Sequence, residues 1–261
     1  MRHSKKVNSL QLLKVATDCR LCSSRDRCLG GRLNIEAQAL FSNAIRRIPF
    51  ETGKKIFKTE QKFGSLYAIY SGAVKVQACA YDGTNLISGF YFPGDLVGIE
   101  SIGDPLYRSD AIALTQTIVC EIPFNQLKKL FDSIPALQHE VMMLLAEKIR
   151  NTESTFIFDR HSHAEARLLL FLRHISKYIG IDRPDGSTRV HLPMSKSDVA
   201  CYLDIRPESL SRALKKLESK RVVRNYTRCL DFFDIEKHIA IIYGKGDSNS
   251  NPRKIPILYY R

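Results

Sequence analysis

The sequence predicts an α+β protein built from a β-roll, one long helix and a winged helix-turn-helix. Three observations predict this fold class. Short apolar and β-branched runs, separated by regularly spaced glycines, extend from about Ile48 to Pro123. A stretch of about 25 residues with heptad-spaced apolar side chains follows. Beyond it, two short helical patterns joined by a tight turn precede two strand-like runs.

The β-roll is predicted from strand-like runs such as "SLYAIY", "AVKVQACA", "LISGFYF" and "TIVCEI". Glycines at positions 53, 64, 72, 83 and 94 separate such runs at intervals of 8 to 11 residues. Regular short strands with turn signals are typical of an all-β roll or barrel. The Asp-Gly pair in "YDGTN" (81–85) predicts a hairpin between two of the strands.

The long helix is predicted to begin near Pro135, with Ser133 as its N-cap. One stripe of side chains recurs at alternating steps of three and four residues, the spacing of a helix that pairs with another helix. The members of this seam are Met142, Leu145, Ile149, Thr152 and Phe156. A second stripe, formed by Leu137, Val141 and Leu144, is expected to pack on the β domain. Two separate apolar faces favour a homodimer over a single broad core-facing stripe.

The remaining helical patterns predict a winged helix-turn-helix. The run "HAEARLLLFLRHISKYIG" (163–180) is amphipathic and stops at a glycine. Residues 197–203 form a short helix, Asp204 occupies a tight left-handed turn, and Pro207 opens a second helix that ends near Glu218. "RVVRNYTRCLDFF" then forms a two-stranded wing. An ordinary helical hairpin explains neither the basic second helix nor the wing.

The charge is unevenly distributed in a chain of otherwise ordinary globular composition. The 261 residues carry a net charge of +13, of which residues 160–261 contribute +9, from 20 Lys and Arg against 11 Asp and Glu. This balance indicates a polyanionic partner such as nucleic acid, although a solvated surface produces the same pattern. No run approaches the ~20 apolar residues that cross a bilayer, and no signal peptide is evident, so we expect a cytoplasmic protein with no membrane partner.

Three of the seven cysteines, Cys19, Cys22 and Cys28, lie within ten residues. An odd cysteine count in a chain expected to be cytoplasmic argues against a disulfide framework. Thiolates are soft ligands that select iron–sulfur clusters, zinc or cuprous copper, so the cluster of thiols indicates metal or redox chemistry. The spacing C-x2-C-x5-C favours iron–sulfur only modestly, because zinc sites usually pair two C-x2-4-C units. Cys79, Cys201 and Cys229 are expected to be buried and structural.

The three predicted parts together resemble the cyclic-AMP receptor protein/FNR superfamily of bacterial transcription regulators, over roughly residues 19–241. Within it, the sequence is most similar to FNR, the fumarate and nitrate reduction regulator, in "LYAIYSGAVK", "GFYFPGDLVGIESIG", "VCEIPF" and "ESLSR". The cysteine spacing with a distant fourth cysteine inside "VCEIP", here Cys120, also matches. The resemblance implies that Cys19, Cys22, Cys28 and Cys120 ligate an oxygen-labile [4Fe–4S] cluster. It also implies a cyclic-nucleotide-binding-like jelly roll as the sensor domain.

A cyclic-nucleotide pocket is the first alternative within this superfamily. Arg108 and Ser109 resemble the pair that holds the cyclic phosphate, but the Gly-Glu pair for the ribose is displaced, because Ile99 separates Gly98 from Glu100. A one-residue slip in a strand turns the carboxylate to the other face, so we expect a vestigial pocket. A zinc-stabilised DNA-binding regulator, and a redox enzyme or electron carrier, are further alternatives. The chain lacks a flavin or nicotinamide glycine fingerprint, so we expect no enzymatic activity.

The second helix of the motif is expected to read double-stranded DNA. Glu208, Ser211 and Arg212 share one face, and their chemistry suits cytosine N4, thymine and guanine O6/N7. The resemblance implies TTGAT…ATCAA inverted repeats, bound by a homodimer that also contacts RNA polymerase. The candidate phosphate contacts are Arg206, Lys196, Lys215 and Lys216. The expected segments are 1–30 for the cysteine-rich segment, 31–132 for the roll, 133–159 for the dimer helix, 160–243 for the DNA-binding domain and 244–261 for the tail.

Overall fold

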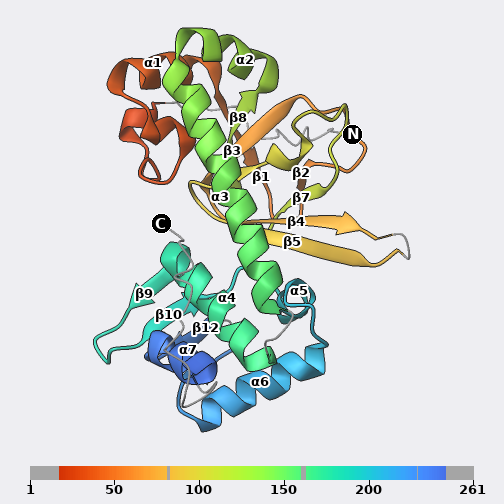
Figure 1. The fold of residues 1–261 in the computed structure, drawn as a ribbon, viewed down its shortest axis with the longest axis vertical. Coiled ribbons are helices and arrows are strands. Elements are labelled where there is room, and N and C mark those ends of the chain that lie inside the picture. The colour runs from red at the N-terminus through yellow and green to blue at the C-terminus, as the bar shows by residue number, and fades with distance from the viewer. Residues whose placement is uncertain (1–17, 81–82, 160–162, 228, 245–261) are drawn as a thin grey trace, which may run out of the picture. The chain divides into compact units, whose positions relative to one another are not determined.

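A computed structural model describes residues 18–80, 83–159, 163–227 and 229–244, and the side chains of residues 151–159 and 243–244 lie outside that description. The chain divides into two compact units, Met1–Val76 with Phe90–Val141 and Gln77–Gly89 with Met142–Arg261. The predicted α+β fold class is confirmed (Figure 1). Among the described residues, none of the helices combines the length and the apolar composition that a membrane span requires.

Two four-stranded sheets form the roll. The first has the order β1 (Arg46–Phe50), β8 (Thr117–Pro123), β3 (Ser65–Ser71) and β6 (Leu96–Val97). The second has the order β2 (Lys55–Phe57), β7 (Asp110–Ala113), β4 (Val74–Cys79) and β5 (Asn85–Tyr91). Side chains from both sheets meet in one core, where the ring of Phe57 stacks on that of Tyr107 at 4.2 Å between centroids. Burial of these alternating apolar side chains is what stabilises a roll of such short strands.

The predicted hairpin is present, because β4 and β5 are neighbours in their sheet. The backbone N–H of Ala80 donates to the carbonyl of Thr84 at 2.8 Å, which closes the turn, and Gly83 adopts a positive φ of 84°. Residues 81–82 of the predicted "YDGTN" turn lie outside the described ranges. A positive φ is the backbone state in which glycine avoids the steric cost that other residues meet.

Helices flank the first sheet. Two 3-10 turns, Cys19–Leu21 and Leu29–Arg32, precede α1 (Ile35–Ala44), which packs beside α2 (Phe124–Ser133). The sequence did not reveal α2, and the expected N-cap role of Ser133 is wrong, since this residue ends α2. The predicted start of the long helix is confirmed, because α3 spans Pro135–Asp159. Helix α2 has the spacing of an amphipathic helix but is only ten residues long, and it follows a strand without a break.

The two predicted apolar stripes of α3 differ in burial. Leu137 and Val141 are buried and Leu144 is half-buried, as expected for the stripe that packs on the roll. In the seam, Met142 and Ile149 are 54% and 58% exposed, and Leu145 is half-buried. The side chains of Thr152 and Phe156 lie outside the description. The described part of the seam is therefore an exposed apolar face.

The second unit holds the predicted winged helix-turn-helix. Its helices are α4 (Ala164–Ile179), α5 (Lys196–Tyr202), α6 (Pro207–Ser219) and α7 (Ile235–Gly244). Its sheet has the order β11 (Val223–Asn225), β12 (Cys229–Phe232), β10 (Thr188–His191) and β9 (Gly180–Asp182). Ser195 and Asp198 form a capping box at the start of α5. Asp204 has a positive φ of 50°, which confirms the left-handed turn between α5 and α6.

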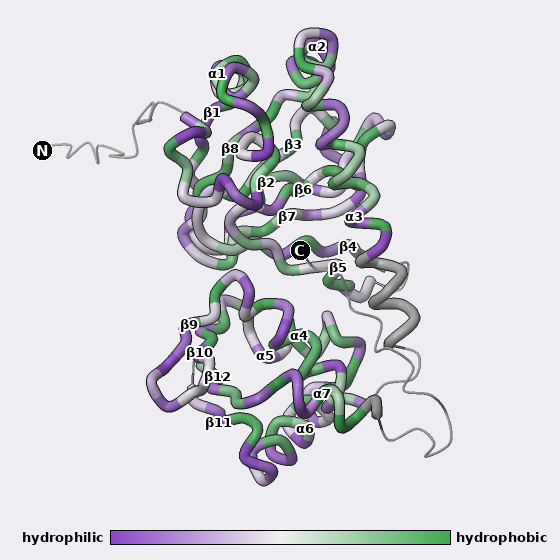
Figure 2. The backbone as a smooth tube through the Cα atoms, turned by 60° about the vertical axis from the view of Figure 1, so that its left-hand side comes forward, coloured by the Kyte–Doolittle hydropathy of each residue, from purple (hydrophilic) through white to green (hydrophobic). Residues whose placement is uncertain are grey.

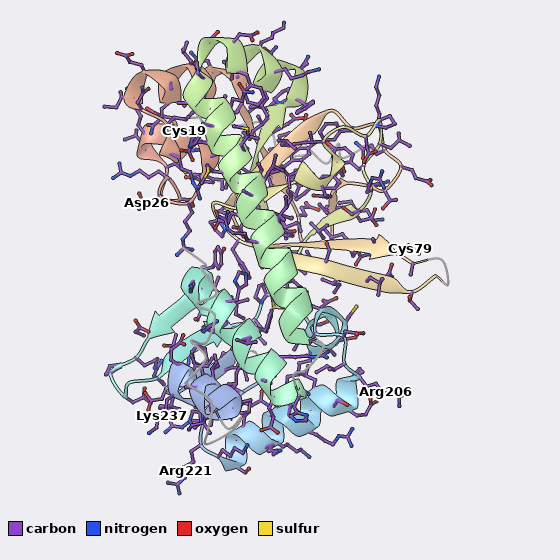
Figure 3. The ribbon with its side chains drawn as sticks, viewed as in Figure 1. Cys19, Asp26, Cys79, Arg206, Arg221 and Lys237 are labelled. Atoms are coloured by element: carbon purple, nitrogen blue, oxygen red, sulfur yellow. The ribbon has the colours of Figure 1, made fainter. Side chains whose placement is uncertain are left out.

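The three cysteines expected to be buried are not all buried. Cys79, at the end of β4, is exposed, so the prediction is wrong there (Figure 3). Cys201 and Cys229 are half-buried. The reason is the place of Cys79 at the outer end of a hairpin, where side chains of both faces meet solvent.

Candidate metal centre and DNA-reading helix

The structure brings Cys19, Cys22, Cys28 and Cys120 together around one pocket in the first unit. Three come from the segment before α1, and Cys120 comes from the middle of β8 (Figure 3 labels Cys19). Cys19 and Cys120 are buried, and Cys22 and Cys28 are half-buried. The rest of the lining consists of Arg25, Gly31, Phe41, Ile45, Arg47, Ala68 and Ile122. The pocket is thus an apolar cradle with four thiols, two arginines and no carboxylate.

Turns rather than strands shape the cysteine segment. The N–H of Cys22 donates to the carbonyl of Cys19 at 3.3 Å, and that of Cys28 donates to Ser24 at 3.0 Å. The N–H of Cys19 also donates to the hydroxyl of Ser42 in α1 at 3.1 Å. The side-chain amide of Gln38 in α1 also donates to the carbonyl of Gly31 at 3.3 Å, so the loop that carries the thiols is tied both to itself and to α1.

Two glycines allow this loop to close. A Cβ on Gly30 would lie 2.8 Å from the sulfur of Cys19, and one on Gly31 would lie 1.8 Å from the carbonyl oxygen of Arg25. Both distances are below ordinary van der Waals contact. Any larger residue at either position would displace the thiols or break the turn.

Burial favours the protonated form of three of the four thiols, those of Cys19, Cys28 and Cys120. It raises the pKa of Cys28 to about 12 and that of Cys120 to about 11, and it also raises the pKa of Cys19. The neighbouring guanidinium of Arg47 acts in the opposite direction on Cys120 but is outweighed by burial. Because the thiolate is the metal ligand, metal binding at this pocket must release protons.

The donor set fits a group that takes four thiolates. The cavity between the thiols encloses about 20 Å3, roughly the space of one water molecule. In the described part of the chain, no three His, Cys, Asp or Glu side chains converge as the ligands of a single metal ion would. The thiols line a shared pocket instead.

In the segment expected to be a vestigial nucleotide pocket, the candidate phosphate-binding side chains contact neighbouring carboxylates. Arg108 forms a two-pronged ion pair with Asp104, one contact of which is 2.8 Å. The hydroxyl of Ser109 donates to the carboxylate of Glu100 at 2.8 Å. The expectation that a one-residue shift in a strand turns the Glu100 carboxylate to the other face of the sheet is wrong. Glu100 lies in a 3-10 turn (Ile99–Ser101) and not in a strand. Its carboxylate meets Ser109 rather than turning away.

The predicted DNA-reading face is exposed on α6, a helix along which hydrophilic and hydrophobic residues alternate (Figure 2). Glu208, Ser211 and Arg212 are exposed, and the opposite face buries Leu210, Ala213, Leu214 and Leu217 in the second unit. Arg206 is the N-cap residue of α6 and is also exposed (Figure 3). The three predicted base-reading side chains therefore lie together on one solvent-facing side of the helix.

The predicted phosphate contacts differ in their surroundings. Lys215 is exposed, and the ammonium of Lys196 lies 3.3 Å from the amide oxygen of Asn225. Lys216 forms an ion pair with Glu165 of α4 at 2.5 Å. A carboxylate that already neutralises Lys216 reduces what this lysine can contribute to binding a phosphate.

Two residues of α4, Glu165 and Arg167, contact α6 or the turn before it, and neither contact was predicted from the sequence. Glu165 binds Lys216 and also Lys220, the latter at 2.8 Å. Burial raises the pKa of Glu165, but the hydrogen bonds from the two lysines outweigh this and leave it below its ordinary value. Arg167 donates to the carbonyls of Leu203 at 2.9 Å and Asp204 at 3.4 Å, in the turn of the motif. The partners lie 36 to 55 residues away, so no local pattern signals them.

Comparison with known proteins supports both halves of the fold. Residues 47–133 match the cyclic nucleotide-binding domain family, and residues 166–237 match the Crp-like helix-turn-helix domain family. FixK2 from Bradyrhizobium japonicum has a similar fold, with a TM-score of 0.68 and 22% identity over 76% of this chain and 96% of that one. At this identity the likeness establishes the fold alone.

Two curated relatives indicate the family. The anaerobic regulatory protein of Pasteurella multocida is 30% identical over 237 residues, which are 90% of this chain and 85% of that protein. The fumarate and nitrate reduction regulatory protein of Escherichia coli is 32% identical over 213 residues, 81% of this chain and 85% of that protein. These relatives are transcription regulators and not enzymes. The chain therefore belongs to the FNR (fumarate and nitrate reduction) family of the CRP/FNR superfamily, whose members regulate transcription through a DNA-binding helix-turn-helix.

Proposed function

We propose that this protein is an oxygen-responsive regulator that binds DNA as a homodimer while Cys19, Cys22, Cys28 and Cys120 hold a [4Fe–4S] cluster. The observation that carries the proposal is the meeting of these four thiols in one apolar pocket, although 92 residues separate Cys28 from Cys120. When bound, the cluster supplies an oxygen-labile cross-link between the N-terminal segment and β8. As a regulator of transcription, the chain is expected to work in the cytoplasm and to contact RNA polymerase.

A short path of contacts joins the pocket to the seam of α3. Four residues after Cys28, the guanidinium of Arg32 forms an ion pair with Glu140 of α3 at 3.6 Å. On the other side, β8 runs from Cys120 directly into α2, and α3 follows after one residue. A change in the position of the cysteine segment would therefore reach the part of α3 that lies just before Met142, the first member of the seam. Interfaces with two states respond to a few kcal/mol, so loss of the cross-link is a sufficient trigger.

The exposed face of α3 supports the homodimer. Met142 and Ile149 expose more than half of their surfaces on a helix whose other stripe is buried. In sedimentation experiments on anaerobic protein, we expect Met142→Glu to weaken dimers by tenfold or more. Met143→Glu, one position off the seam and 43% exposed in the native chain, is the matched control. An equal loss of dimer affinity in the Met142→Glu and Met143→Glu variants would argue against the predicted seam.

Anaerobic purification tests the cluster. We expect four irons and four sulfides per chain and a broad absorbance near 400 nm that bleaches in air. Cys120→Ser should lose iron and sulfide, whereas Cys79→Ser should retain both, because Cys79 is exposed and does not line the pocket. A colourless protein with one zinc per chain would instead establish the zinc-stabilised alternative.

DNA binding tests the response and the operator. With a duplex that carries TTGAT…ATCAA, fluorescence anisotropy should show tight binding under nitrogen and at least tenfold weaker binding after exposure to air. The Cys120→Ser protein should bind weakly under both conditions. Equal affinity of the wild type with and without air would contradict the proposed sensing role.

A cyclic-nucleotide response is the second candidate, and the family match of residues 47–133 favours it. The ion pair of Arg108 with Asp104 and the bond of Ser109 to Glu100 occupy the groups that a cyclic phosphate needs. Calorimetry with cyclic AMP separates the candidates. We expect no heat of binding, and micromolar binding would favour the cyclic-nucleotide regulator.

A further inference from the structure

Arg47 of β1 lies directly opposite Cys120 of β8 in the antiparallel register of the first sheet. Ala68 of β3 pairs with Cys120 from the other side. Side chains of directly opposed residues project from the same face of a sheet, with Cβ atoms about 4.5–5.5 Å apart. Both Arg47 and Ala68 line the cysteine pocket, which agrees with that register. The sheet therefore places one long cationic side chain next to one of the four thiols.

The guanidinium of Arg47 is held in place without an acidic partner in the described structure. Its Cζ lies 3.8 Å from the centroid of the Tyr70 ring, and its Nε is buried and makes no hydrogen bond among the described residues. The preceding residue, Arg46, differs, because it forms an ion pair with Glu121. A buried N–H donor without an acceptor is costly, so its retention calls for a physical reason.

The second arginine at the pocket is placed differently. Arg25 is exposed, and its guanidinium lies 3.6 Å from the carboxylate of Asp26. No Asp or Glu lines the pocket. Arg47 is therefore the cationic group of the lining that is fixed by the sheet and not already paired with a carboxylate.

Four thiolates around a four-iron cluster leave a net negative charge in an apolar cradle. Burial of a charge is unfavourable unless an opposite charge or hydrogen-bond donors compensate it. Groups just outside the ligands also set the reduction potential of such clusters, through charge and hydrogen bonds to sulfur. Arg47 supplies a positive charge and a hydrogen bond beside Cys120, and its buried Nε–H has no acceptor among the described residues.

We propose that Arg47 is the counter-charge of the cysteine pocket: it positions Cys120, offsets the negative charge of the bound cluster and raises its reduction potential. This inference rests on the proposed function, because it assumes that the four thiols bind the cluster. Loss of the cation favours the less negative, oxidised cluster and weakens retention of iron. Arg47 is a positioning residue and not a ligand.

The test compares Arg47→Gln, Arg47→Lys and Arg25→Gln with the wild type, all purified anaerobically as full chains. Iron and sulfide are counted, and the cluster is titrated with dithionite against redox mediators to obtain its potential. We expect Arg47→Gln to disfavour reduction by about tenfold, a shift of about 59 mV to lower potential for one electron. It should also lose iron to a chelator at least threefold faster. Arg47→Lys keeps the positive charge, so its cluster should have a reduction potential close to that of the wild type. Arg25→Gln should have the wild-type reduction potential and rate of iron release.

The outcomes separate this inference from the proposed function. Wild-type protein without iron and sulfide would overturn both. Wild-type protein with a full cluster, and an Arg47→Gln variant with the same potential and iron release, would overturn the role of Arg47 alone. Far-ultraviolet circular dichroism identifies a variant that fails to fold. If Arg47→Gln fails to fold, the Arg47→Lys variant decides between a charge role and a purely structural role. Lysine keeps the positive charge but lacks the planar group that stacks on Tyr70. A purely structural role therefore predicts that Arg47→Lys also changes the reduction potential.

Discussion

Glu165 of α4 forms an ion pair with Lys216 of α6, at 2.5 Å between oxygen and nitrogen. The same carboxylate also binds Lys220, just beyond the end of α6. One acidic side chain thus fixes the reading helix on the helix behind it and neutralises two lysines near the DNA-reading face. The two lysine side chains are 60% and 49% exposed, and ion pairs that reach solvent contribute little to stability, so we expect the main effect of this contact to be on the charge that DNA meets.

Glu165→Gln should strengthen non-specific DNA binding, because it frees the two lysines for phosphates. Each additional phosphate contact makes the slope of log K against log salt steeper by about 0.9. We expect a steepening between about 1 and 2 and a smaller ratio of specific to non-specific affinity. Glu236→Gln is the control, since its carboxylate pairs with Arg173 and not with α6. An unchanged slope would show that the lysines remain unavailable to DNA.

Arg167→Gln should destabilise the turn between α5 and α6, because it removes the donor for the carbonyls of Leu203 and Asp204. A charged hydrogen bond to a partly buried acceptor is worth about 1.5–3 kcal/mol. Urea unfolding should show a loss of about that size, with weaker specific DNA binding. Lys237→Gln removes one exposed charge from α7 and should leave both unchanged. Normal stability of Arg167→Gln would mean that solvent replaces the lost donor.

Arg212→Ala should relax discrimination at the guanine of each half-site by about 1–3 kcal/mol, since the guanidinium can donate twice to guanine O6 and N7. Lys215→Ala should instead weaken binding to all sequences alike and reduce the salt slope by about 1. Competition binding with single-base variants of the operator measures both. Equal weakening on every sequence by Arg212→Ala would refute its base-reading role.

Glu140→Gln should reduce the coupling between the cluster and the dimer, because it removes the ion pair of α3 with Arg32. A partly exposed pair of this kind contributes about 0.2–1 kcal/mol. We therefore expect the ratio of dimer affinities with and without the cluster to fall by about 1.4- to fivefold. Analytical ultracentrifugation of both forms measures it. Glu147→Gln, farther along α3, is the control, and the idea fails if the two variants behave alike.

His174 of α4 should make the second unit less stable at acidic pH. Burial, together with the positive charges of Lys177 and Arg173, lowers its pKa from 6.5 to about 4. The unfolded chain therefore binds the proton first, so stability is full above pH 6.5 and falls as the pH drops towards 4. The loss is on the order of 3 kcal/mol at 1.36 kcal/mol per pKa unit.

Urea unfolding between pH 7 and pH 4 checks this dependence. His174→Phe keeps an aromatic ring beside Tyr178 but cannot titrate, so its profile should be flatter than that of the wild type. His191→Gln, at an exposed position in β10, should keep the wild-type profile. A parallel decline in His174→Phe would assign the acid sensitivity to other groups.

Local patterns predicted most of the fold, and the failures have local causes. Pro135, Asp204 and Pro207 mark turns or helix starts through backbone preferences that act within a few residues, and all three expectations are confirmed. Helix α2 was missed because it is short and follows a strand without a turn signal. The exposed position of Cys79 was missed because strand residues near a hairpin end lose the burial that their pattern suggests.

Periodicity, capping and spacing act along the chain, so the fold class, the helix-turn-helix and the residues proposed to bind metal and bases could be predicted from local patterns. The neighbours of these residues follow from the folded structure. The meeting of Cys120 with the N-terminal thiols, the pairing of Arg47 with Cys120, and the contacts of Glu165 and Arg167 with the motif all join residues at least 36 positions apart. Strand register and helix packing set such distances, and neither is written in any local run of residues.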